Sequence, residues 1–226
     1  MRLMPRTHVD FLEDSDFEKA VKWVVDGYQE NNNIKRNGID PFKTVFDMYN
    51  KDMSFTSWKN AEGIRQNDKT VNNKVGEFHQ KILGSIAGWK DLQTGDVADI
   101  CNDSKTIFVE LKNRWNTVKG SNMIDMWNHL NDIVENKHHG STAYWGFINA
   151  KDGSSGEGIW TIQKKSNPKV KKIWGKNVYK MVTGDVDSLE KVWNALPKVL
   201  DKVLQKNTLL DESEKSNLVK WFQSGY

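Results

Sequence analysis

The sequence predicts an α/β protein with a central mixed β-sheet flanked by helices. Apolar residues recur at helical spacing near the N-terminus, strand-like segments cluster between residues 95 and 183, and helical spacing returns from residue 188. Helices, a mixed sheet and then helices within 226 residues are typical of one α/β domain. We expect residues 1–70 to form an N-terminal helical region packed on a core that comprises residues 71–226 and includes the C-terminal helices.

Capping residues and apolar spacing predict the N-terminal helices. Ser15 can cap a helix through Glu30, and Asp40 followed by Pro41 predicts a second helix to about Tyr49. Residues 50–70 show weak periodicity, so we expect a loop with short turns there. A third helix is expected to end near Gly88, on the stripe Val71, Val75, Phe78, Ile82 and Ile86.

The rest of the chain predicts a sheet followed by two helices. Strands are expected on both sides of a turn at Asn102–Asp103–Ser104. Later strands are expected at residues 142–149, 158–163 and 177–183, and helices at residues 122–136, 188–204 and 212–222.

Composition excludes several classes of protein. Hydrophobic residues make up 37% and charged residues 28%, which excludes global disorder. The single cysteine, Cys101, excludes an intrachain disulfide and a multi-cysteine zinc site. There is no apolar run of membrane-spanning length, no apolar core of a signal peptide and no nucleotide-binding glycine loop. We therefore expect a cytoplasmic protein that needs neither a membrane nor a nucleotide cofactor.

One predicted strand carries an acid and a base on the same face. In TIFVELK, Glu110 and Lys112 point away from the apolar face formed by Ile107, Val109 and Leu111. A turn centred on Asp103 and Ser104 would place Asp99 opposite Phe108 and diagonally next to Glu110. In that register, Asp96 would lie on the face of Leu111, and a one-residue slip would exchange the two aspartates.

Two carboxylates near a lysine suit the hydrolysis of a phosphodiester. Mg²⁺ is usually held by one or two carboxylates together with substrate phosphate and water. A lysine beside it can orient the attacking water and stabilise charge that develops in the transition state. The same three side chains could instead form a structural ion pair, and spacing alone does not decide between the two.

The series Asp99, Glu110, Leu111 and Lys112 resembles the catalytic core of the PD-(D/E)xK nuclease superfamily, although Ala98 stands where that motif has proline. The segments GEFHQKILGSIAGW (76–89), ELKNRWNT (110–117) and VYKMVTGDVDSLEKVWNALP (178–197) together resemble a type II restriction endonuclease. The nearest subfamily cuts GGNCC-type sites. The resemblance spans roughly residues 71 to 205, which makes residues 71–226 the expected nuclease core.

This resemblance implies a Mg²⁺-dependent, site-specific endonuclease that acts on double-stranded DNA as a homodimer. It implies that Asp99, Glu110 and Leu111 bind the metal and that Lys112 serves the attacking water. Glu77 matches the position of an auxiliary acid, and its alternative is a solvated helix charge near Lys81. The other functions considered are a DNA-binding protein that has the nuclease fold without catalysis and a repair or junction nuclease.

Two groups of residues are expected to contact DNA. Lysines dominate residues 164–180, which contain no acid. A solvated loop is the alternative, but beside a nuclease core we favour phosphate contacts. The first group is Lys164, Lys165, Lys169, Lys171 and Lys172, and the second, which follows the catalytic lysine, is Asn113, Arg114, Asn116 and Lys119.

Overall fold

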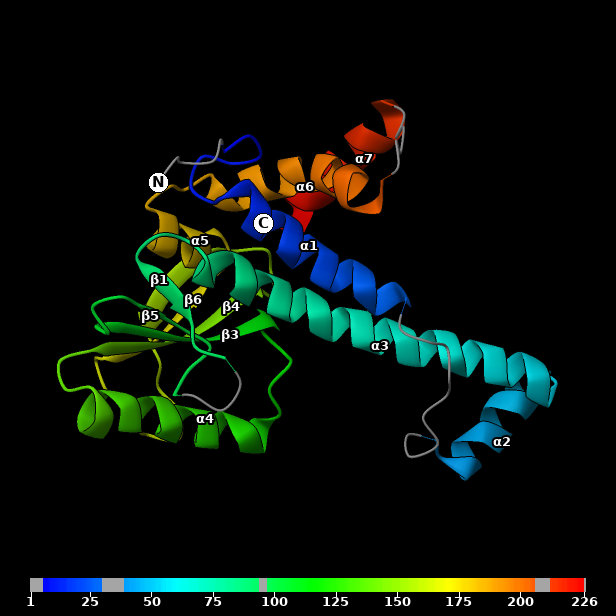
Figure 1. The fold of residues 1–226 in the computed structure, drawn as a ribbon. Helices are drawn as coiled ribbons and strands as arrows, with labels where there is room; N and C mark the ends of the chain where they lie inside the picture. Colours follow the sequence, from blue (N-terminus) through cyan, green and yellow to red (C-terminus); the bar gives the residue numbers. More distant parts are fainter. Residues whose placement is uncertain (1–5, 30–38, 94–96, 206–211, 226) are drawn as a thin grey trace.

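A six-stranded mixed sheet lies between helices, which confirms the expected fold class (Figure 1). The computed structural model describes residues 6–29, 39–93, 97–205 and 212–225 of the chain. The strand order is β1-β2-β3-β4-β6-β5, with β3, β4 and β6 parallel and the other neighbouring pairs antiparallel. The strands are β1 Trp89–Asp91, β2 Ile100–Asn102, β3 Ile107–Arg114, β4 Thr142–Asn149, β5 Gly156–Ile159 and β6 Val170–Trp174.

Two apolar cores cover the two faces of the sheet. On one face, Val109 and Leu111 of β3 pack against helices from both ends of the chain. On the other face, Phe108 and Trp145 pack against α4 and the π-helical turn that follows it. The helices are α1 Asp14–Gln29, α2 Pro41–Asn50, α3 Phe55–Gly84, α4 Gly120–Asp132, η2 Ile133–Lys137, α5 Lys176–Thr183, α6 Ser188–Leu204 and α7 Glu212–Gly225.

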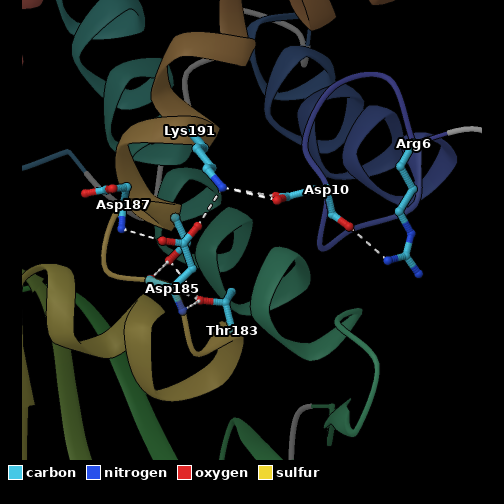
Figure 2. Close-up of polar contacts among 7 residues, drawn as sticks. Arg6, Asp10, Thr183, Asp185, Asp187 and Lys191 are labelled. Carbon is cyan, nitrogen blue, oxygen red and sulfur yellow. Dashed lines mark hydrogen bonds and ion pairs between the residues drawn. The ribbon is translucent and has the colours of Figure 1, made fainter.

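The N-terminal segment is held against the C-terminal half of the chain. Helix α1 packs against α3 and α6. The Lys191 ammonium of α6 lies 3.1 Å from the Asp10 carboxylate and 2.7 Å from that of Asp185, as Figure 2 shows. In the same segment, the Arg6 guanidinium donates to the Asp10 carbonyl over 2.9 Å. Elements from the two ends of the chain therefore share one core.

Several expected elements are confirmed. Helix α2 begins at Pro41, and the Asp40 carboxylate accepts from the backbone N–H of Phe42 and Lys43 as an N-cap. Strand β4 and helix α6 have the expected bounds. Cys101 is buried. None of the described helices is long and apolar enough to span a membrane.

The expected loop at residues 50–70 is wrong, because α3 is one helix of 30 residues that begins at Phe55. The Ser54 hydroxyl caps it by accepting from the Ser57 N–H. Its first half lies beside α2 and away from the sheet (Figure 1), so this part of the helix needs no continuous apolar stripe. The boundary expected at residue 70 falls inside this helix.

The strand expected at residues 177–183 is wrong, and the lysine-rich stretch holds a strand that was not expected. Residues 177–183 are helical in α5, where Val178, Tyr179 and Val182 are buried, and seven residues were too few to separate the two periods. The lysine-rich stretch contains strand β6, not only loop, because Val170 and Ile173 are buried between β4 and β5. Smaller differences are that β5 ends at Ile159 and that α1 begins at Asp14.

The turn between β2 and β3 is longer than expected. Ile100 pairs with Val109 and Cys101 with Phe108, a shift of two residues from the expected register. The turn takes in Lys105, which has a φ of 53°, and the Asn102 carboxamide oxygen accepts from the N–H groups of Thr106 and Ile107. Because the shift is even, every side chain keeps its expected face.

Candidate active site

Three side chains expected at the site converge at the β2–β3 pair. The Lys112 ammonium lies 2.6 Å from the Glu110 carboxylate and 3.5 Å from the Asp99 carboxylate. Glu110 and Lys112 project from one face of β3, and the register of β2 places Asp99 beside them. These side chains are 22%, 30% and 25% exposed, so they meet at the edge of the core with limited access to water.

Backbone contacts hold Asp99 in place. Its N–H donates to the Val109 carbonyl over 3.1 Å, just before the first residue of β2. Its carboxylate accepts from the Leu111 N–H over 2.6 Å. The Leu111 side chain is buried in the core, so at this site Leu111 offers only its backbone.

The charges at this site shift the pKa values of Asp99 and Lys112. Burial, and then the charge of Glu110, raise the pKa of Asp99, while Lys112 and the Leu111 N–H act in the opposite direction. Burial alone would lower the pKa of Lys112, but the charges of Asp99 and Glu110 outweigh it and raise that pKa. Lys112 therefore stays protonated at neutral pH, and Asp99 sits where its own charge is disfavoured.

The site opens into a cleft of about 640 Å³. Asp99, Leu111 and Lys112 line it, and so does Glu77 of α3, which is exposed. The sequence did not single out the remaining polar and aromatic residues of this cleft, because they come from elements far apart in the chain. They include Trp23 of α1, Asn72, Asn73 and Gln80 of α3, and Asp91 of β1.

Gln80 connects α3 to the end of β1 and to the residue before β2. Its side-chain amide donates to the Asp91 carboxylate over 2.8 Å and to the Asp99 backbone carbonyl over 3.3 Å. Gly84, one turn later, permits this approach, because an added Cβ would lie 2.6 Å from the Asp91 backbone nitrogen. The end of α3 thus positions the backbone that carries Asp99.

Comparisons with known proteins show the family of this chain. The family model of the Eco47II restriction endonuclease matches residues 9–205. The chain belongs to the Eco47II restriction endonuclease family. It is 29% identical to the type II restriction enzyme Eco47II of Escherichia coli, over 96% of this chain and 98% of that enzyme. It is 28% identical to the type II restriction enzyme Sau96I of Staphylococcus aureus, over 88% of this chain and 82% of that enzyme.

Membership of the Eco47II family makes the protein a type II restriction endonuclease, a site-specific deoxyribonuclease that hydrolyses phosphodiester bonds. The match begins at residue 9 and so includes α1 and α2, which the sequence resemblance left unassigned. Restriction endonucleases of this kind generally depend on a metal, and their substrate is DNA.

The donor set of this Eco47II-family site fits a hard divalent cation. Asp99 and Glu110 supply carboxylate oxygens, and burial already disfavours the charge on Asp99, which a cation would offset. Among the residues that the structure describes, no three His, Cys, Asp or Glu side chains come together as a metal site. His79 is half-buried, and its Nδ1 lies within hydrogen-bond distance, 2.8 Å, of the Tyr179 hydroxyl. The alternative aspartate, Asp96, lies outside the described residues.

Of the four residues expected to contact DNA just after Lys112, one lines the cleft. Asn113 lines it, and its side-chain and backbone oxygens accept from the Asn149 amide over 2.9 Å and 3.0 Å. Arg114 and Asn116 are exposed. Lys119 is exposed at the N-terminus of α4.

The expected lysine group lies on and before β6, two strands from β3 on this Eco47II-family fold, and Lys172 is level with Glu110. The Lys169 carbonyl accepts from Ala143, which pairs with Phe108, so Lys169 is level with the start of β3. This position is about four residues, or roughly 13 Å along a strand, from Lys112. Lys171 pairs with Glu157 at 2.9 Å, and Lys172 lies 5.3 Å from the centre of the Trp145 ring. Of the two other lysines, Lys165 donates to Asn128 over 2.7 Å and Lys164 is exposed.

Proposed function

We propose that Asp99 and Glu110 hold Mg²⁺, with the Leu111 carbonyl as a third oxygen ligand, for site-specific cleavage of double-stranded DNA. The observation that carries this proposal is the single ammonium of Lys112 in contact with both carboxylates. Two carboxylates and a carbonyl leave positions for water and a phosphate oxygen, as Mg²⁺ prefers. When bound, the ion supplies charge neutralisation at the phosphate and acidifies water.

Lys112 acts as a fixed positive charge. In the metal-free site the charges of Asp99 and Glu110 raise the pKa of Lys112, so its Nζ carries three protons at neutral pH. It can donate to the attacking water and to a phosphate oxygen, and so orient the first and stabilise the charge that develops on the second. Glu77 is proposed as the auxiliary acid, since it lines the same cleft as Lys112.

DNA contacts are proposed first for the residues beside the cleft. Asn113, Arg114, Asn116 and Lys119 continue directly from the catalytic strand and are exposed or line the cleft. Contacts with the DNA phosphate backbone further along a duplex are proposed for Lys164, Lys165 and Lys169. Lys171 and Lys172 are proposed for the same role, and like Lys165 they would exchange a contact within the fold for one with phosphate.

Two copies of the chain would cut the two strands. A two-fold symmetric dimer matches a palindromic or pseudo-palindromic site, with one active site for each strand. The resemblance to the subfamily that cuts GGNCC-type sites makes such sites the first to test. We further propose that the enzyme works in the cytoplasm, where Cys101 stays reduced, and that it needs no nucleotide.

Cleavage of plasmid DNA tests these roles. With Mg²⁺, the wild type should give discrete fragments, and chelation should abolish them. Asp99→Ala and Glu110→Ala should bind DNA and fold like the wild type but cut at least about a hundredfold more slowly. Normal cutting by either variant would remove that residue from the metal site. Light scattering on the DNA complex should report two chains per duplex.

A further inference from the structure

Helix α2 and the first half of α3 form an arm that extends away from the sheet (Figure 1). Helix α2 packs against α3, and its buried residue is Thr44. The Lys43 ammonium pairs with Asp47 along α2, so this side chain is engaged within the helix. No residue of the arm lines the catalytic cleft.

The apolar stripe of α2 faces outward. Its four members lie at positions i, i+3, i+4 and i+7, which place them on one side of a helix. A helix of this pattern normally buries that side. Here Phe42, Val45, Phe46 and Tyr49 are 80%, 55%, 74% and 86% exposed, and Phe55 at the start of α3 is 59% exposed.

The exposed apolar area of this stripe together with Phe55 approaches one side of a standard protein interface. At about 200 Å² for each aromatic side chain, the exposed fractions of Phe42, Phe46, Tyr49 and Phe55 sum to roughly 600 Å². A standard interface buries about 800 Å² per partner, and the largest apolar patch on a typical monomer is about 300–600 Å². Val45 adds to the total, so the stripe is close to one side of such an interface.

The charge of the arm argues against DNA as the occupant. Residues 40–54 contain three aspartates and two lysines, so no positive excess attracts phosphate. Further along the arm, the Arg65 guanidinium is paired with the Glu62 carboxylate over 2.7 Å. A neutral apolar stripe suits a protein surface of the same kind, and a two-fold interface pairs each patch with its own copy.

We propose that the α2 stripe, with Phe55, is the surface through which two copies of this chain join. This inference rests on the homodimer of the proposed function and assigns its interface. Antiparallel packing of α2 against α2 of the second copy places Val45 and Phe46, at the middle of the stripe, beside the two-fold axis. A substitution there acts twice in each dimer.

Sedimentation velocity without DNA tests the interface. The wild type should be a dimer at micromolar concentration, and Phe46→Glu should be a monomer, because two carboxylates would meet at the axis. Phe46 is already exposed within one chain, so circular dichroism and the melting temperature of the monomer should change little. The matched control is Ile64→Glu, which should stay dimeric. Ile64 is 67% exposed, and it lies nine residues after Phe55 and so about half a turn away around α3.

A mixture of Phe46→Glu and Phe46→Lys should restore the dimer, since the opposite charges meet at the axis. Loss of folding could not produce this rescue. A wild type that is monomeric without DNA, or a Phe46→Glu variant that stays dimeric, would overturn the assignment. If the DNA complex still holds two chains per duplex in either case, the proposed homodimer on DNA stands and only this surface is wrong.

Discussion

Replacing Lys112 with methionine separates its role in chemistry from its role in stability. Methionine keeps the length of the side chain but removes the ammonium that contacts both carboxylates. If this charge stabilises the transition state, the single-turnover rate at saturating enzyme should fall about a hundredfold to a thousandfold, or roughly 3–4 kcal/mol. Affinity for DNA without metal should hardly change, because Lys112 is one charge among several near the cleft.

The same substitution should destabilise the metal-free protein. Two charge-assisted contacts are lost and two carboxylates are left facing each other, so we expect a loss of about 2 kcal/mol, or a melting temperature lower by about 4–8 °C. Added Mg²⁺ should then stabilise the variant more than it stabilises the wild type, because the cation replaces the missing charge. The pKa of Asp99 should rise further once Lys112 no longer lowers it, which moves the acidic limb of the rate profile to higher pH.

The matched control is Lys90→Met. Lys90 pairs with Asp103 at 3.1 Å on the exposed surface, so both rate and stability should stay within about 0.5 kcal/mol of the wild type. Lys112 does not stabilise the transition state if Lys112→Met cuts within tenfold of the wild-type rate, or if it loses DNA affinity alone. An equal response of variant and wild type to Mg²⁺ would show that Lys112 does not compensate the two carboxylates.

Three other substitutions follow from the site and its supports. Asp99→Asn should abolish cleavage yet raise the melting temperature in chelator near pH 7. The pKa of Asp99 in the folded protein is raised above that in the unfolded chain. The free energy of unfolding therefore falls as pH rises from the unfolded pKa through the folded pKa. Below both pKa values the advantage of the variant should vanish. Gln80→Leu should slow cleavage by roughly tenfold to a hundredfold with unchanged DNA affinity, because the Asp99 backbone loses a support; an effect on affinity alone would contradict this positioning role. Burial lowers the pKa of His79 to about 4 from 6.5, so unfolding free energy should fall by about 3 kcal/mol as pH drops through that range, and His79→Gln should lack this dependence in urea titrations.

The strands that carry the proposed site could be predicted, because the residues that form it are close together in the sequence. Side-chain alternation alone put Glu110 and Lys112 on one face, and the structure brings Asp99 to them. The error in the turn length was harmless, because a shift of two residues preserves the face that each side chain occupies. A shift of one residue would have exchanged Asp99 for its neighbours.

The parts that could not be predicted depend on contacts distant in the chain. Gln80 looked like an ordinary helix surface residue, and only the approach of β1 to the end of α3 gives it two partners. Strand β6 was hidden because Lys171 and Lys172 lie in a sheet where Glu157 and aromatic rings accommodate their side chains. The first half of α3 was hidden for a different reason, since a helix that extends beyond the core shows little apolar periodicity.

Helix α3 is a stiff rod that joins the arm to the cleft. At about 1.5 Å per residue, the 22 residues from Phe55 to Glu77 span roughly 33 Å without a break. The second half of this rod is packed into the core, where Phe78, Ile82 and Leu83 are buried. A tilt of about 5° about that half would move the start of α3 by about 3 Å. The half of α3 that carries Glu77 and Gln80 to the cleft therefore also sets where the arm lies.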